Sequence, residues 1–189
     1  MTIGNRVAIL REKFAQSIGL PFAELLTESE IEQALQDEGV AYRKRLFCPI
    51  VTLWAWISQV LDADKSCKKA VSRIVSYLVA SGQNPPSTDT GGYCKARARL
   101  KERMLLGLMR LTGKHSHEQP EEEFLWCGRR VAVFDGSSLT MADTEKNQKK
   151  YPQPKSQAKG CGFPQARIVC GFSLSTGAVL DAAFSPLSA

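Results

Sequence analysis

The spacing of the apolar residues changes near residue 130, and this change constrains the fold most. Before it, apolar side chains recur every three or four residues, as in Val7, Leu10 and Phe14, which is typical of amphipathic helices. After it, the short β-branched run from Arg130 to Asp135 is typical of a strand. This order of patterns predicts an α+β protein in which a helical region precedes a sheet.

Several helix boundaries can be predicted in the first region. Thr27 with Glu30 three residues later is a capping-box start. Pro49 suits the first turn of a helix through Leu61, and its apolar residues nearly encircle it, so we expect this helix at the centre of the core. Another helix is expected from Ser66 to Ala80, before the turn signals that follow.

A further helix is expected from about Thr90 to about Leu111. Its cations recur at intervals of four, four and seven residues and would lie along one helical face: Lys95, Arg99, Arg103 and Arg110. Cations so placed repel each other unless an anion lies against them. DNA is one candidate for this anion, and a solvated face is the alternative.

The second region is predicted to hold strands and loops. Two strand-like runs follow the first one, from Gln165 to Ser173 and from Ala178 to Phe184, and Ser175-Thr-Gly between them favours a tight hairpin turn. The polar stretches from Gly113 to Glu123 and from Ser137 to Pro164 are interpreted as a linker and a long loop. A loop of such length in a compact domain is typical of a functional segment.

Composition favours a globular cytoplasmic protein, with 43% hydrophobic and 23% charged residues. The apolar stretch from Pro49 to Leu61 is too short and too polar to span a bilayer, and residues 1–12 lack a secretory signal. No two of the six cysteines have CxxC spacing, so we interpret them as reduced, mostly buried side chains. His115 and His117 lack an evident third metal ligand.

The net charge of +6 is gathered into two blocks. From Arg43 to Lys114 there are fourteen Lys or Arg against four acids, and from Glu145 to Arg167 there are six against one. Clustered basic charge is typical of proteins that bind the phosphate backbone of nucleic acids. Solvated surface charge is the alternative.

Asp135 is the candidate catalytic residue. It is expected at the C-terminal end of the first strand, where a carboxylate followed by Gly136 and small hydroxyl residues can be presented to a metal ion. The same Asp-Gly-Ser sequence is also a common turn.

The motifs around Asp135 carry a family resemblance. They are Val133-Phe-Asp-Gly-Ser-Ser-Leu-Thr-Met-Ala-Asp-Thr-Glu-Lys-Asn147, then Tyr151-Pro-Gln-Pro, Gln157, Gly160-Cys-Gly-Phe-Pro164 and Gly177-Ala-Val-Leu-Asp181. Upstream, the related segments begin at Ser66, Pro86 and Tyr93. From about residue 50 onward the chain resembles the DDE transposases of the insertion-sequence-four group. Ala142 stands where that family usually has Pro.

The resemblance implies an RNase H-like catalytic domain in which two Asp and one Glu surround two Mg²⁺ ions, or Mn²⁺ in their place. Asp135 corresponds to the first Asp and would be a metal ligand. The second Asp and the Glu would lie on later elements, which this chain, ending at Ala189, does not contain. Asp143, Glu145 and Asp181 do not stand at equivalent positions. We therefore interpret the chain as the N-terminal portion of a transposase, inactive in cleavage by itself.

The resulting hypothesis has three segments. Residues 1–115 form a helical DNA-binding region, residues 116–129 form a linker, and residues 130–189 begin an RNase H-like domain. Charge and spacing suggest the residues that contact the DNA backbone: Arg97, Arg99, Lys101, Arg103, Lys146, Lys149, Lys150 and Lys159.

The expected partners are double-stranded DNA at the transposon ends and in the target, and a second copy of the chain, near the nucleoid and away from membranes. The parent protein would cleave DNA and transfer strands. One alternative is an inactive DNA-binding protein that occupies the ends. The other is a helical domain with no role in nucleic-acid binding.

Overall fold

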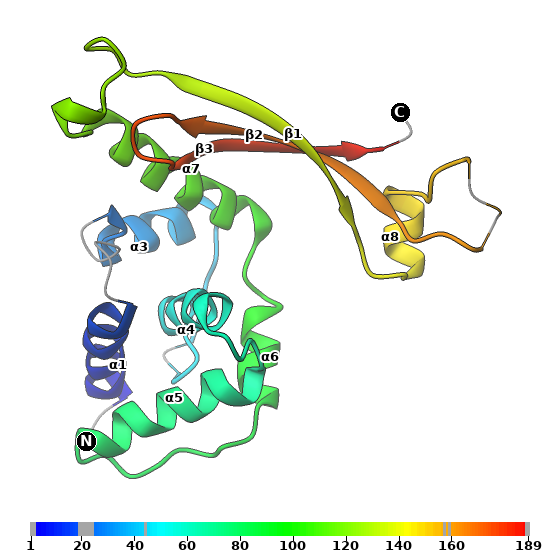
Figure 1. Cartoon of the computed structure of the whole chain (residues 1–189). Coiled ribbons are helices and arrows are strands. Elements are labelled where there is room, and N and C mark those ends of the chain that lie inside the picture. Colours follow the sequence, from blue (N-terminus) through cyan, green and yellow to red (C-terminus); the bar gives the residue numbers. More distant parts are fainter. Residues whose placement is uncertain (1–2, 19–24, 44, 157, 159, 188–189) are drawn as a thin grey trace. The chain divides into compact units, whose positions relative to one another are not determined.

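The computed structural model describes residues 3–18, 25–43, 45–156, 158 and 160–187, with helices first and a sheet last (Figure 1). The chain divides into two compact units, Met1–Leu108 and Met109–Ala189. The first unit holds α1 (Ile3–Ile18), α3 (Glu28–Asp37), α4 (Pro49–Leu61), α5 (Cys67–Ala80), α6 (Gly91–Arg97) and the start of α7 (Glu102–Glu118). The second holds the end of α7, the short helix η1 (Glu122–Phe124), β1 (Ala132–Thr140), α8 (Glu145–Lys150), β2 (Gln165–Ser173) and β3 (Val179–Pro186).

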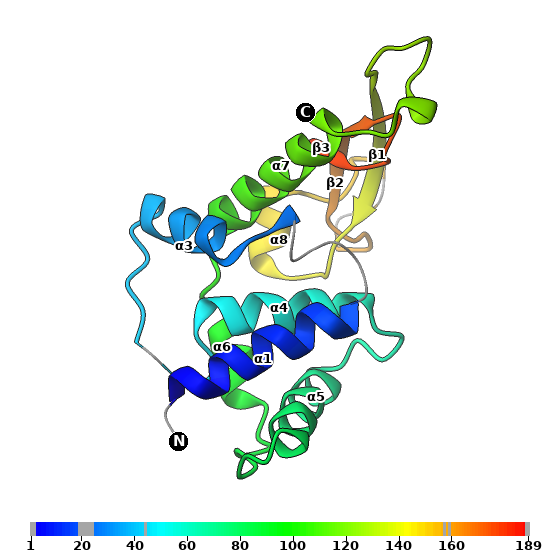
Figure 2. The ribbon, with the colours of Figure 1, turned by 90° about the vertical axis from the view of Figure 1, so that its left-hand side faces the viewer.

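Helix α4 is the centre of the first unit, as its apolar pattern predicts. It lies among α1, α5 and α6 (Figure 2), and it also contacts α3. Val51 and Ala55 of α4 are fully buried, as are Leu10 of α1 and Ile74 of α5. Burial of each large apolar side chain in such a core contributes roughly 1.5–3 kcal/mol.

The predicted helix starts are confirmed. The Glu30 carboxylate accepts a hydrogen bond from the backbone N of Thr27 at 2.7 Å, and Thr27 Oγ1 accepts one from the backbone N of Glu30 at 3.3 Å. Ser66 is the N-cap of α5, and its Oγ accepts from the backbone N of Lys69 at 3.1 Å. These side chains satisfy backbone donors that have no partner inside the helix.

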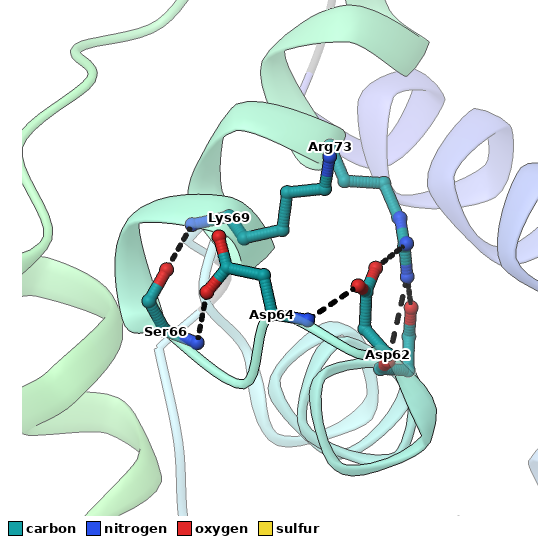
Figure 3. Close-up of polar contacts among 6 residues, drawn as sticks. Asp62, Asp64, Ser66, Lys69 and Arg73 are labelled. Atoms are coloured by element: carbon teal, nitrogen blue, oxygen red, sulfur yellow. Dashed lines mark hydrogen bonds and ion pairs between the residues drawn. The ribbon is translucent and has the colours of Figure 1, made fainter.

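A polar cluster holds the corner between α4 and α5 (Figure 3). Arg73, in the middle of α5, forms an ion pair with Asp62 at the end of α4, and only 25% and 15% of these two side chains are exposed. Asp62 Oδ1 also accepts from the backbone N of Asp64 at 3.0 Å, and Asp64 Oδ1 accepts from the backbone N of Ser66 at 3.0 Å. The hydrogen bond from the Ser66 side chain has the largest effect on the pKa of Asp64, and the bond from the Ser66 backbone has the next largest. Both lower this pKa. The cluster therefore fixes the path between the two helices.

The helix predicted from Thr90 to Leu111 is wrong as a single element, because residues 98–101 separate α6 from α7. The turn is tight: the backbone N of Arg99 donates to the carbonyl of Ala96, and that of Leu100 to the carbonyl of Arg97, both at 3.1 Å. No Gly or Pro marks this break in the sequence. Helix α7 also continues to Glu118, so the first part of the stretch expected as a linker is helical.

The three strands form one antiparallel sheet in the order β1-β2-β3. Ala132 lies opposite Ser173 and Thr140 opposite Gln165, so β1 pairs with β2 along its whole length. The predicted hairpin between β2 and β3 is confirmed as antiparallel. Gly177 in its turn has φ +69°, a conformation that residues with a Cβ rarely adopt.

Gly113 lets α7 approach β3 closely. A Cβ at this position would clash with the carbonyl oxygen of Val179 and lie 3.1 Å from Cα of Leu180. Near this contact, His117 Nδ1 lies 2.9 Å from Ser173 Oγ on β2. A glycine in a helix normally costs stability relative to alanine, but at this position the missing Cβ permits the close approach to β3.

We expect Gly113→Ala to lower the free energy of unfolding by about 1–3 kcal/mol, because the new methyl group must push α7 away from β3. Gly107→Ala is the matched control, since a Cβ there meets nothing within 4 Å on the same helix. That substitution should raise the free energy of unfolding by up to about 1 kcal/mol. Urea unfolding midpoints measure both effects. A stabilising Gly113→Ala would contradict the close approach.

Candidate nucleic-acid interface and carboxylate

Asp135 lies inside β1, and its predicted position at the C-terminal end of the strand is wrong. It is the fourth residue of β1, and the strand continues through Gly136 to Thr140. The Gly-Ser-Ser sequence favours a turn locally, but each of these residues has a partner in β2, which continues the strand. The Asp135 side chain is exposed, and its Oδ1 accepts a hydrogen bond from the backbone N of Gly136 at 2.8 Å.

Asp181, the other aspartate in the three strands, points to the opposite face of the sheet from Asp135. Asp135 lies opposite Cys170, which lies opposite Ala182, so these three residues share a face. Asp181 precedes Ala182 and therefore points to the opposite face. Arg110 donates hydrogen bonds of 2.8 and 3.2 Å to the Asp181 carboxylate. These bonds are the main cause that lowers the pKa of Asp181, and a hydrogen bond from the backbone N of Ala182 is the second.

The residues present around Asp135 do not fit a divalent metal site on their own. Within the described ranges, no group of three or more His, Cys, Asp or Glu side chains is placed to hold a metal ion. Asp143 accepts a hydrogen bond from Gln148 Nε2 at 2.9 Å in the segment after β1. Asp135 is thus a single exposed carboxylate on a strand.

The segment after β1 is more ordered than the predicted loop. Thr144 caps α8, its side chain accepting from the backbone N of Asn147 at 3.2 Å, and Asn147 Nδ2 donates to the carbonyl of Ala142 at 2.9 Å. The residues of the Met-Ala-Asp-Thr-x-x-Asn motif thus start a helix. The prediction of a continuous loop from Ser137 to Pro164 is wrong, since the end of β1 and all of α8 lie in it.

Gln153 organises the remainder of this segment, a role that the sequence analysis missed. Its Oε1 accepts from the backbone N of Gly160 at 3.1 Å and of Gly162 at 3.3 Å. Its Nε2 donates to the carbonyl of Ala158 at 2.8 Å. The sequence signal that could have indicated this role is an amide side chain between two prolines, followed by glycines.

The cations of the second basic block lie mostly on α8. Lys146, Lys149 and Lys150 are all exposed on this helix. Lys150 Nζ lies 5.1 Å from the ring centroid of Tyr151, a cation–π distance. Lys159 lies outside the described residues.

The prediction of one helical face that carries Lys95, Arg99, Arg103 and Arg110 is wrong, because the turn at residues 98–101 separates α6 from α7. Arg97 on α6 is partly buried and donates to Gln59 Oε1 at 3.2 Å. Lys101 Nζ donates to the carbonyl of Glu38 at 2.6 Å. Arg99 in the turn and Arg103 on α7 are exposed, and within the described ranges neither makes an ion pair. Arg99 and Arg103 therefore have guanidinium groups available to an anion.

A pocket next to Arg99 and Lys101 contains further cations that no single motif predicted. It has a volume of about 320 Å³ in the first unit, and Arg43 and Arg45 also line it. Both arginines are exposed. Both belong to the first basic block. No pattern in the sequence predicts that they lie beside Arg99, which follows Arg45 by 54 residues in the chain.

Arg97 contributes to a buried hydrogen-bond cluster around Tyr93. The Tyr93 side chain is fully buried, and its hydroxyl donates to Gln59 Oε1 at 2.6 Å. The guanidinium of Arg97 lies 5.8 Å from the Tyr93 ring centroid. Burial raises the pKa of Tyr93 to about 12.

This shift predicts a loss of stability at alkaline pH. The folded protein holds the phenol proton more tightly than the unfolded chain, in which the pKa is about 10. The resulting stability is complete below pH about 10 and is lost as pH rises through about 12. Tyr93→Phe should therefore reduce the decline in the urea midpoint between pH about 8 and pH about 11. An identical decline in protein and variant would contradict the assignment.

Comparison with known proteins relates the chain to a transposase. Transposase InsG for insertion sequence element IS4 from Escherichia coli (strain K12) is 23% identical to it over 158 residues, which are 83% of this chain. The match covers 35% of InsG, so the chain spans about a third of the length of that relative. No family model and no solved structure matches the chain. No helix among the described residues is long and apolar enough to cross a membrane. The similarity supports, weakly, a transposase relationship for an α+β chain whose first sheet strand carries Asp135.

Proposed function

We propose that this chain is the DNA-binding portion of a transposase, and that its parent protein cleaves DNA at transposon ends and transfers the strands in a metal-dependent reaction. The observation that carries this proposal is the similarity to transposase InsG over most of the chain. That similarity supports DNA in general as the partner. The end repeats, the target DNA and a second copy of the chain are further parts of the proposal.

The arrangement of the second unit supports the catalytic part of the proposal. An RNase H-like domain is expected to begin with three antiparallel strands whose first strand carries a catalytic Asp. Here β1, β2 and β3 are consecutive antiparallel strands, and the first of them carries Asp135. In the parent protein, Asp135 would be a ligand of Mg²⁺ or Mn²⁺, together with carboxylates from later elements.

Exposed cations support the DNA-binding part of the proposal. Arg99, Arg103, Lys146 and Lys149 are exposed, and within the described part of the chain none of them makes an ion pair. Such side chains can neutralise phosphates and release the counterions condensed on DNA.

A second candidate function is a DNA-binding protein without cleavage activity, which would occupy transposon ends. The observation that favours it is the isolation of Asp135, because Asp181 points to the other face of the sheet and Asp143 is bonded to Gln148. A Mg²⁺-dependent plasmid-nicking assay distinguishes the two functions, and a DNA titration distinguishes both from a helical domain without a nucleic-acid role.

A further inference from the structure

The pocket in the first unit combines an apolar interior with a basic rim. It lies among the end of α3, the segment leading into α4 and the turn between α6 and α7. Its lining includes the buried side chains of Leu35, Cys48 and Met104. Its volume of about 320 Å³ is at the lower end of the range for ligand pockets, roughly 300–1,000 Å³. The pocket could therefore enclose one small organic ligand but not a length of DNA strand.

The charges around the pocket are all of one sign among its described lining residues. Arg43, Arg45, Arg99 and Lys101 line it, and no Asp or Glu does. None of the three arginines makes an ion pair with a described residue. Lys101 is directed by the carbonyl of Glu38, which accepts from its Nζ at 2.6 Å. A ligand that uses this rim must carry negative charge.

Two aromatic side chains also line the pocket. Tyr42 is 40% exposed, a large fraction for an aromatic residue beside a cavity. The ring of Phe47 packs against the buried Tyr93, with 6.0 Å between the two ring centroids. A planar ring inserted here could stack on an aromatic face. Inorganic phosphate would leave the apolar lining unused, and a neutral apolar ligand would leave the cations unused.

We propose that this pocket binds one nucleotide, with its base against Tyr42 and Phe47 and its phosphate held by Arg43, Arg45, Arg99 and Lys101. The nucleotide comes either from an unpaired position in a DNA strand or from a free mononucleotide. The first source rests on the proposed function, and the second does not. Aromatic stacking of a base and cationic capture of its phosphate are the two interactions that single-stranded nucleic-acid sites share.

Three probes test the proposal by fluorescence anisotropy: a fully paired duplex, the same duplex with one unpaired nucleotide, and a free deoxynucleoside monophosphate. The monophosphate is used unlabelled as a competitor and, carrying a fluorophore, as a direct ligand. The duplex with the unpaired nucleotide should bind about 5- to 150-fold more tightly than the paired one, the range that stacking of one base supplies. Tyr42→Ala should remove this preference and leave the affinity for the paired duplex unchanged. Tyr42→Phe should keep it, because the ring is retained.

Matched controls separate the pocket from general charge and general aromatic effects. Trp126→Ala removes an aromatic side chain that is 62% exposed and does not line the pocket, so it should keep the preference. Arg45→Gln should weaken binding of the monophosphate, whereas Lys68→Gln, at an exposed position on α5, should not. Thermal midpoints equal to that of the parent chain show that a variant is folded, and only such variants are compared. If Tyr42→Ala does not fold, Arg45→Gln serves as the test.

The outcomes distinguish this proposal from the proposed function. Equal affinity for both duplexes, together with no binding of the monophosphate, overturns the nucleotide pocket and leaves DNA binding intact. Competition by the monophosphate that depends on Tyr42 supports the pocket with a free nucleotide as its source. If neither duplex binds but the monophosphate binds in a Tyr42-dependent manner, the pocket stands and the proposed function fails.

Discussion

Asp135→Asn should abolish metal-dependent DNA cleavage in a protein that contains this chain followed by the second Asp and the Glu of the transposase family. The amide keeps the size and shape of the side chain but removes its negative charge. Removal of one preorganised electrostatic group from an active site typically costs about 100- to 1,000-fold in rate, and we expect at least that loss here. DNA affinity should be unchanged, because Asp135 carries no positive charge for phosphate binding.

Two other carboxylates of the second unit provide controls for this experiment. Asp143→Asn and Asp181→Asn remove the same charge from the same unit, but Asp143 is bonded to Gln148 and Asp181 is held by Arg110 on the other face of the sheet. Both variants should keep cleavage activity. Supercoiled-plasmid nicking in the presence of Mg²⁺ measures all three. If cleavage survives Asp135→Asn but is lost in Asp181→Asn, the assignment of the catalytic role to Asp135 is wrong.

The 189-residue chain by itself should not nick its transposon ends with Mg²⁺ or Mn²⁺. One carboxylate cannot fix two divalent ions at the separation of about 3.5–4 Å that in-line displacement requires. Nicking by the chain alone that Asp135→Asn eliminates would show that other groups of this chain complete the site.

The helical core was predictable because its signals are local. Pro49 at the first turn and apolar residues on all sides define α4, and side-chain caps such as Thr27 define where helices begin. Each of these features acts within a few residues, so the sequence alone carries it. The hairpin between β2 and β3 was predictable for the same reason, since Gly177 lies in a short turn between two β-branched runs.

The remaining features depend on contacts between distant residues. The break at residues 98–101 has no Gly or Pro, so propensity favoured a continuous helix. The continuation of β1 beyond Asp135 requires pairing with β2, about 30 residues later in the chain, which local turn preference does not reveal. The pocket is lined from three separate segments, and only folding brings Arg45 near Arg99.

The affinity of the chain for duplex DNA should depend steeply on salt. A plot of the logarithm of the binding constant against the logarithm of the salt concentration is linear and falls. Its slope grows in magnitude by about 0.9 for each phosphate that the protein neutralises. If six or more phosphates are contacted, affinity should fall about 1,000-fold or more between roughly 50 and 200 mM salt. Arg99→Ala with Arg103→Ala should reduce the magnitude of the slope by roughly 1 to 2, because both guanidinium groups are exposed and free of ion pairs with described residues.

The double variant Lys68→Ala with Lys69→Ala is the control for net charge. These lysines are exposed on α5, and they are not among the residues proposed to contact DNA. Their removal lowers the net charge by the same amount but should leave the slope nearly unchanged. Circular dichroism of both double variants should show helix content equal to that of the parent chain.

The salt-dependent titration of the 189-residue chain against duplex DNA tests the proposed DNA-binding role most directly. A linear log–log plot, with a slope that the Arg99 and Arg103 variant flattens and the Lys68 and Lys69 variant does not, is the predicted result. An absence of binding at low salt, or a slope that neither pair of substitutions changes, would contradict the proposed DNA-binding role, because Arg99 and Arg103 would then be solvated without contacting DNA.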